Sequence, residues 1–290
     1  MRHVLVRIGT AIALAASLVL PTAWPAVAAP ARDNSAARPV YFVHGYSFLG
    51  NPPGHNCWDG YWRTLGDAMR SYGWTGSYHT VGFYRGDTNC NTKILDGDRD
   101  TPIQELGRLL AWNIYTSFSK SNISVDVVAH SMGGLVTRAA LTGVARKESG
   151  WPPYLYIEDV VTLSTPHKGA RGAGICGVFT RQCQDMTEGS PFLRWLYNAP
   201  QSAQGTDWTL IGAEDDDIVS NESAVGMSGA GHTVIYRAGQ GIEHEVIPQI
   251  TSGSYQQWYW NYYDNKSYWT GSGAPPTRVA NNAIYHWWKW

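Results

Sequence analysis

The chain has 290 residues, with 22 basic and 23 acidic side chains and a net charge of −1 at neutral pH. A charge this close to zero argues against binding of nucleic acid or of an anionic membrane surface. Once a leader is removed, about 260 residues remain, which is the size of one large α/β domain. The sequence contains no internal repeat, and we expect a monomer.

Residues 1–28 have the pattern of a secretory signal peptide. Basic residues near the start precede an apolar run over 8–20, and an Ala-Val-Ala cleavage site occupies 26–28. The run is shorter than the about 20 residues that a spanning helix needs, and Pro21 ends it. We therefore expect a secreted, extracellular protein without a transmembrane segment, whose mature N-terminus over 29–38 is disordered.

Short apolar runs alternate with amphipathic segments in the domain that we expect over 39–290. Helical periodicity and boundary signals predict helices over 61–72, 101–120 and 132–145. Apolar runs rich in β-branched and aromatic residues predict buried strands over 39–43, 79–84, 123–129, 157–163, 208–212 and 233–237. Strands that alternate with helices imply right-handed βαβ units and a mostly parallel sheet flanked by helices. Ligands of such sheets bind beyond the carboxyl ends of the strands.

The run VVAHSMGG over 127–134 places a serine between a buried strand and a helix. A hydroxyl becomes a nucleophile only when a base takes its proton, and a sharp strand-to-helix turn exposes it to base and substrate. Such a turn needs small neighbours, as in G-x-S-x-G, from which this chain departs at Ala129. A capping serine is the alternative, but a cap does not require these neighbours. We predict that Ser131 is the nucleophile.

The same turn predicts an oxyanion hole. The amide of Met132 opens the helix and has no partner within it, so it can bind an oxyanion. The second donor should be a backbone amide that follows the first strand, and the amide of Tyr46 is the candidate. We expect His44 to support this loop, and His130 to pack or hydrogen-bond beside the nucleophile.

Three motifs resemble those of the secreted bacterial lipases and esterases of the α/β-hydrolase family. They are AHSMGG over 129–134, VHG over 43–45 and LSTPHKG over 163–169. The resemblance covers roughly residues 38–250. It implies the α/β-hydrolase fold and the order serine, acid, histidine along the chain.

The resemblance also selects the acid and the base. The acidic run over 214–217 follows a predicted strand, and the Asp-x-Ile-Val pattern of related lipases selects Asp216, with Asp215 and Asp217 as alternatives. The base should follow the last strand, which favours His244 over His232. The resemblance implies hydrolysis of a lipid or another ester through an acyl-enzyme, without a cofactor. We expect a triacylglycerol lipase, with a short-chain esterase or a polyester depolymerase as alternatives.

Four cysteines in an exported chain favour two disulfides. Of the three possible pairings, chain order and loop grouping favour Cys57–Cys90 and Cys176–Cys183. No C-x-x-C pair exists, so zinc is not expected, and no ligand set for another metal is visible.

Two further segments carry functional hypotheses. The long glycine-rich connection over 164–206 is a candidate lid, because connections of this length are usually functional or mobile. The segment over 254–290 is dense in Trp and Tyr. We favour a packed segment that closes the edge of the sheet, since large aromatics dominate burial. Binding of a carbohydrate or polymer surface is the alternative.

Overall fold

A computed structural model describes residues 28–170, 180–261 and 265–285. In these residues nine strands form one sheet in the order β3-β2-β1-β4-β5-β6-β7-β8-β9. Pairing is parallel from β3 to β7, and β8 and β9 are antiparallel. The strands are β1 (Val40–Val43), β2 (Tyr78–Tyr84), β3 (Thr92–Gly97), β4 (Val125–His130), β5 (Ile157–Leu163), β6 (Asp207–Ala213), β7 (His232–Tyr236), β8 (Tyr255–Asn261) and β9 (Lys266–Gly273).

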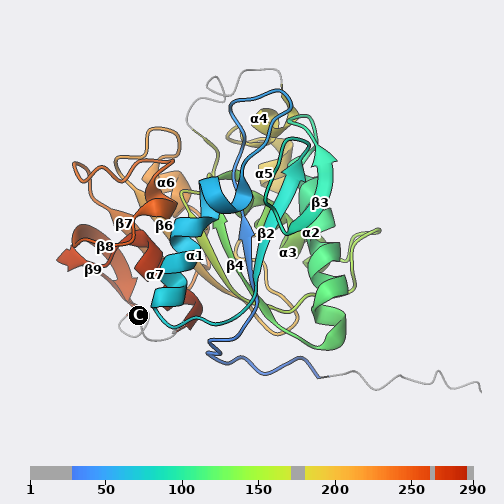
Figure 1. Ribbon diagram of the computed structural model, residues 1–290, viewed down its shortest axis with the longest axis horizontal. Helices are drawn as coiled ribbons and strands as arrows, with labels where there is room; N and C mark the ends of the chain where they lie inside the picture. The colour runs from blue at the N-terminus through green and yellow to red at the C-terminus, as the bar shows by residue number, and fades with distance from the viewer. Residues whose placement is uncertain (1–27, 171–179, 262–264, 286–290) are drawn as a thin grey trace, which may run out of the picture.

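Helices cover both faces of the sheet. Residues of α2 and α3 pack in one core layer, and residues of α1 and α7 pack in the other. In Figure 1, α2 lies near β3 at the right of the view, and α1 and α7 lie toward the left, where β8 and β9 form the edge. The helices are α1 (Arg63–Ser71), α2 (Ile103–Ser117), α3 (Met132–Ala145), α4 (Arg181–Asp185), α5 (Pro191–Trp195), α6 (Asn221–Ala224) and α7 (Pro276–Tyr285), with the short turns η1 (Cys57–Trp62), η2 (Ser119–Ser121) and η3 (Ile247–Gln249).

Alternation along the strands divides the core into two layers. In β1, Tyr41 and Val43 pack in one layer with residues of α2 and α3. Val40 and Phe42 point to the other face and pack with residues of α1 and α7. Successive strand side chains face opposite sides of a sheet, so one buried strand contributes to both layers.

The predicted mostly parallel sheet is confirmed, as are the six predicted strands and three predicted helices, within a few residues at their ends. Prediction missed β3, β8 and β9. Strand β3 is an edge strand whose central residues are half-buried or exposed, so its sequence lacks the apolar run of a central strand. Strands β8 and β9 carry aromatics on both faces, which hides the alternation that identifies a strand.

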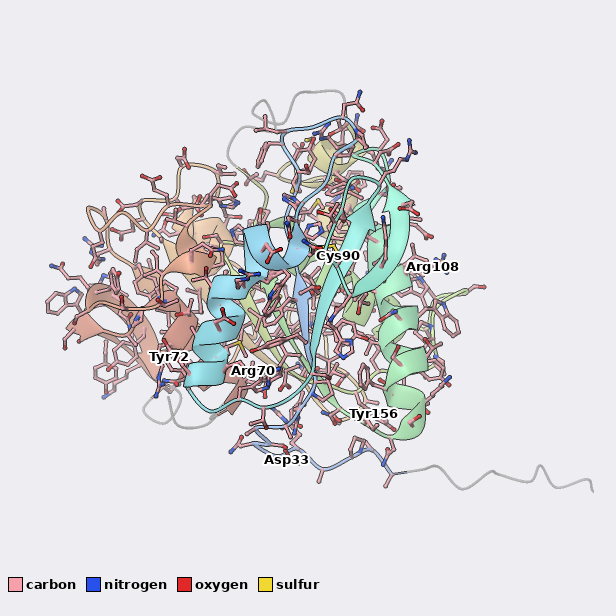
Figure 2. The ribbon with its side chains drawn as sticks, in the orientation of Figure 1. Asp33, Arg70, Tyr72, Cys90, Arg108 and Tyr156 are labelled. Atoms are coloured by element: carbon pink, nitrogen blue, oxygen red, sulfur yellow. A yellow bond between two sulfur atoms is a disulfide. The ribbon has the colours of Figure 1, made fainter. Side chains whose placement is uncertain are left out.

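The segment over 29–38, expected to be disordered, makes ordered contacts in the structure. Arg32 Nη2 donates to Asp159 at 3.1 Å, and the amide of Asp33 donates to Glu158 at 2.8 Å. Arg38 is buried and pairs with Glu158. Figure 2 shows Asp33 at the lower end of the molecule. The segment lacks core residues, but the buried carboxylates of β5 bind its guanidinium groups and order it.

The aromatic segment is part of the sheet. Strand β8 pairs with β7, and β9 pairs with β8. Helix α7 packs Val279, Ala280, Ala283 and Ile284 into the second core layer. None of the helices in the described ranges combines the length and apolar character that a membrane span requires.

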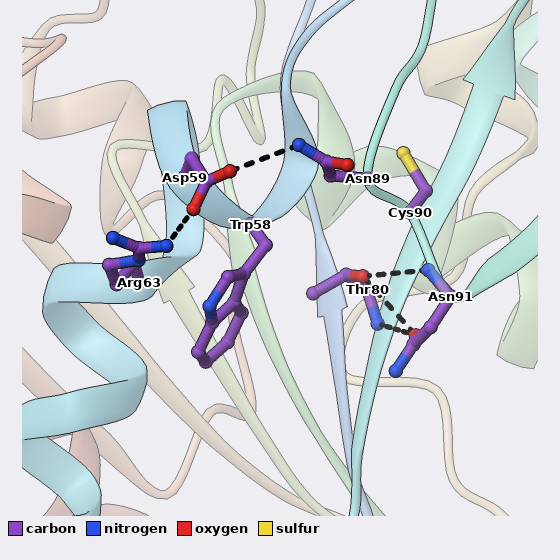
Figure 3. Close-up of a pocket in the computed structure, with 7 residues that line it drawn as sticks. All are labelled: Trp58, Asp59, Arg63, Thr80, Asn89, Cys90 and Asn91. Atoms are coloured by element: carbon purple, nitrogen blue, oxygen red, sulfur yellow. Dashed lines mark hydrogen bonds and ion pairs between the residues drawn. The ribbon is translucent and has the colours of Figure 1, made fainter.

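The predicted Cys57–Cys90 disulfide is confirmed. It joins η1 to the loop after β2, where Cys57 is buried and Cys90 is half-buried. Figure 3 shows Cys90 at the edge of a surface groove whose other residues include Asp59 and Asn89. Cys183 is buried in the core. Its predicted partner Cys176 lies outside the described residues, so that pairing stays a prediction.

The candidate lid over 164–206 contributes to the core where the structure describes it. Cys183, Met186 and Phe192 belong to the layer that contains α2 and α3. Arg138 of α3 donates to the carbonyls of His167 at 3.0 Å and Tyr197 at 2.7 Å. These bonds hold both ends of the connection against the helix. Residues 171–179 lie outside the described residues.

Candidate active site

Ser131 occupies a strained turn between β4 and α3. Its φ of 54° and ψ of −132° are unusual for a residue other than glycine, and such strain clusters at functional sites. A Cβ on Gly133 would collide with the carbonyl of Val43. A Cβ on Gly45 would lie 2.7 Å from that of Ser131. The small residues around the serine therefore let the strand, the helix and the loop after β1 meet at this point.

Side chains of three remote segments meet at this turn. His244 Nε2 lies 2.9 Å from Ser131 Oγ, and His244 Nδ1 lies 2.9 Å from Asp216 Oδ2. All three residues are at most 6% exposed. The arrangement has the form of a nucleophile, a base and an orienting carboxylate.

The local fold distinguishes Asp216 from its acidic neighbours. Asp216 Oδ1 accepts from the amides of Ile218 at 2.9 Å and Val219 at 2.7 Å. Burial by itself would raise the pKa of Asp216, but the bonds from His244 and Val219 lower it overall, so the carboxylate stays ionised. Asp217 is exposed.

Asp215 has a supporting role that sequence reasoning did not identify. Its carboxylate accepts from the amides of Gly239, Gln240 and Gly241 at 2.7–2.8 Å. These residues form the turn that leads to His244. Burial would raise the pKa of Asp215, but the amides lower it overall. The sequence signal for this role is the acidic run over 214–217 together with the glycine-rich turn over 239–241, which follows the next strand.

The predicted oxyanion donors lie on two elements that meet at Ser131. Met132 is the first residue of α3, and the first amides of a helix have no intrahelical acceptor. Tyr46 follows Gly45, which contacts Ser131 directly. The hydroxyl of Tyr46 lies 3.2 Å from Thr180 Oγ1.

His44 supports the loop that carries Tyr46. One ring nitrogen lies 3.0 Å from the carbonyl of Gly45, and the other lies 3.1 Å from Asp87 Oδ2. Burial would raise the pKa of Asp87, but His44 and backbone amides lower it overall. In the described part of the chain, His44, Cys57 and Asp87 place possible metal ligands within 4.8 Å of one another. Because Cys57 is in a disulfide, this group does not fit a metal ion.

The remaining histidines near the motifs have other partners. His130 bonds to Tyr61 and to the carbonyl of His244. His167 is buried, with Nε2 3.1 Å from Thr162 Oγ1. His232 begins β7 and lies 3.3 Å from Asp207 at the start of β6. That position is at the opposite end of the parallel strands from Ser131.

Comparison with known proteins places the chain in a family. Residues 36–267 match the family described as PGAP1-like alpha/beta domain. The chain belongs to this family. The PGAP1-like domain thus has the α/β-hydrolase fold, with a nine-strand, mostly parallel sheet flanked by helices. No curated protein matches the sequence.

Solved structures similar to this PGAP1-like protein include several named as lipases. Bacillus licheniformis lipase BlEst2 in its propeptide form is 17% identical, with a TM-score of 0.42, over 67% of this chain and 45% of that one. Aspergillus fumigatus lipase B is 13% identical, with a TM-score of 0.48, over 86% and 56%. A lipase-esterase related protein from Clostridium acetobutylicum is 13% identical, with a TM-score of 0.42, over 75% and 91%. The chain thus spans about half the length of the first two proteins.

Proposed function

We propose that this protein is a secreted serine hydrolase of carboxylic esters, with Ser131 as nucleophile, His244 as base and Asp216 as the orienting acid. The observation that carries the proposal is the continuous contact from Ser131 Oγ through the imidazole to the carboxylate, at 2.9 Å for each step. The disulfide fits an oxidising compartment, and the signal peptide pattern supports export.

The geometry supports an acyl-enzyme mechanism. Ser131 Oγ attacks the ester carbonyl carbon while His244 Nε2 takes its proton, and the Met132 and Tyr46 amides stabilise the oxyanion. His244 then protonates the departing alcohol, which leaves an acyl group on Ser131. Water attacks this acyl group by the same steps and releases the acid. The proposed mechanism needs no cofactor.

The finer proposal is a lipase that acts on acylglycerols. It rests on the resemblance of the AHSMGG, VHG and LSTPHKG motifs to those of bacterial lipases. Rates on esters of increasing acyl length, measured with and without an emulsion, test it. A lipase should prefer long chains and gain rate at the emulsion surface. A preference for short, dissolved esters would favour the short-chain esterase instead.

Replacement of the nucleophile tests the coarser proposal. Ser131→Ala should lower the rate of ester hydrolysis by about 10⁶-fold, because the proposed nucleophile, base and acid act as one unit. The variant should also lose labelling by an organophosphonate. The melting temperature should stay close to that of the parent. Hydrolysis within tenfold of the parent would show that Ser131 is not the nucleophile.

A second candidate function concerns the aromatic hairpin of β8 and β9. Trp258 and Trp269 face each other across the two strands and are 42% and 52% exposed. This exposed pair favours adhesion to a carbohydrate or polymer surface. Because α7 is part of the core, point variants test this better than truncation. Trp258→Ala with Trp269→Ala should retain hydrolysis of a soluble ester and lose binding to insoluble polymer particles. Unchanged binding would remove this candidate.

A further inference from the structure

A chain of hydrogen bonds connects the loops on the two sides of Ser131. The amide of Gly45 donates to the hydroxyl of Tyr61 at 2.9 Å, and this hydroxyl lies 2.5 Å from Nδ1 of His130. Nε2 of His130 lies 2.9 Å from the backbone carbonyl of His244. The chain thus runs from the loop of the oxyanion hole, past the nucleophile, to the loop of the base.

The direction of every bond follows from the chemistry of its two ends. A backbone amide only donates, so the oxygen of Tyr61 accepts from Gly45 and its own proton is available to His130 Nδ1. Nδ1 then carries no proton, and Nε2 must carry the proton of the neutral ring. A backbone carbonyl only accepts, which matches this Nε2–H of His130. All three bonds are therefore satisfied by one arrangement of protons.

The protonation states of the two side chains agree with this arrangement. Burial, and then the charge of Glu245, raise the pKa of Tyr61, so the phenol keeps its proton. Burial, and then the charge of His244, lower the pKa of His130 well below its ordinary value, so the ring stays neutral. His130 is 1% exposed, and water does not compete for its bonds.

This series of hydrogen bonds lies where small displacements matter for catalysis. Gly45 is in direct contact with Ser131, and His130 immediately precedes the nucleophile. The rings of His130 and His244 are 4.9 Å apart between centroids. The carbonyl of Tyr61 accepts a further bond, from Gln249 Nε2 at 2.6 Å, just beyond the base loop.

We propose that Tyr61 and His130 are positioning residues that hold the oxyanion loop and the base loop in register around Ser131. The inference rests on the proposed ester hydrolysis and names two residues that act on the reaction without touching the substrate. Tyr61 sets the position of the Gly45 amide, and His130 sets the position of the His244 backbone. An error of about 1 Å in such a geometry can cost about 100-fold in rate.

Tyr61→Phe is the first test, because it deletes one hydroxyl and leaves the ring. The variant should lower kcat on a soluble ester about tenfold, which corresponds to about 1.4 kcal/mol of activation free energy. KM should be unchanged, because a positioning role acts through the Gly45 amide and the His244 backbone rather than through a substrate contact. Tyr41→Phe is the matched control, since the buried Tyr41 also loses a hydroxyl bond, to Asn113 Oδ1 at 2.7 Å. The control should lose stability and keep its kcat.

Variants of His130 provide a second, independent test. His130→Ala removes both bonds and should lower kcat by more than Tyr61→Phe does. His130→Gln keeps an N–H that can reach the carbonyl of His244, so it should recover much of the loss. The combined loss in Tyr61→Phe with His130→Ala should be smaller than the product of the single losses, because the two residues act as one unit.

The outcomes separate this inference from the proposed function. A parent that does not hydrolyse the ester, or an active Ser131→Ala variant, overturns the proposed function and this inference with it. With an active parent and an inactive Ser131→Ala, a folded Tyr61→Phe that keeps its kcat within about twofold overturns only the positioning role. A kcat loss in Tyr41→Phe as large as that in Tyr61→Phe also overturns only the positioning role. If Tyr61→Phe does not fold, a lack of rescue by His130→Gln overturns the proposal.

Discussion

Removal of the Cys57–Cys90 disulfide should lower the stability of the protein and leave its folded site unchanged. The bridge joins residues 33 positions apart, and in the chain-entropy model a loop of this length contributes about 4 kcal/mol. The cross-link acts by restricting the unfolded chain. In a domain of this size each kcal/mol shifts the melting temperature by about 2–4 °C, so we expect a fall of about 8–16 °C.

Noncovalent bonds should keep the folded geometry after reduction. The amide of Cys57 donates to the carbonyl of Thr88, and the amide of Thr88 donates to the carbonyl of His55, both at 2.9 Å. Asn89 Nδ2 donates to Asp59 at 3.0 Å, as Figure 3 shows. Because these bonds join the same two loops, kcat/KM at 25 °C should stay within about threefold of the parent.

Thermal melts of the parent with and without a phosphine reductant measure the effect. Reduction keeps both sulfur atoms, so the comparison includes no cavity at Cys57. The half-buried Cys90 gives the reductant access. In the variant with Cys57→Ala and Cys90→Ala, any remaining effect of the reductant reports the predicted Cys176–Cys183 pair. Peptide mapping without reduction identifies the linked cysteines directly.

Two results would refute this reasoning. A melting temperature that changes by less than about 2 °C on full reduction would mean that the bridge hardly restricts the unfolded chain. A loss of activity at 25 °C in a protein that is still folded would mean that the bridge itself shapes the site.

Three further predictions follow from single side chains. His244→Ala should lose nearly as much kcat/KM as loss of the nucleophile, whereas His232→Ala should keep most of it, and the reverse order would contradict the assignment. Burial raises the pKa of Asp126 to about 8, so the folded protein holds a proton that the unfolded chain releases near pH 4. The contribution of Asp126 to the free energy of unfolding should therefore be lost as pH rises from about 4 to about 8. The stability of Asp126→Asn relative to the parent should rise with pH over this range in denaturant titrations. Buried Ser164 has a φ of 48°, so Ser164→Gly should be about 1 kcal/mol more stable than Ser164→Ala.

Local constraints explain what the sequence determined by itself. The turn at Ser131 needs a buried strand before it, a helix after it and small residues such as Gly133 beside it, and these are neighbours in the chain. The central strands of the sheet are buried on both faces, so they appear as continuous apolar runs. Because both signals are local, the fold class and the strained turn at Ser131 could be predicted from the sequence alone.

Contacts between remote segments were decided only by the tertiary structure. Asp215 and Asp216 are adjacent and chemically alike, but the backbone directs one to the turn over 239–241 and the other to His244. The bond between Tyr61 and His130 joins residues 69 positions apart. No local pattern specifies which of many buried polar groups will meet, because that depends on how the strands and helices pack. The chain itself determined the chemistry of the turn at Ser131, and packing decided which side chains surround it.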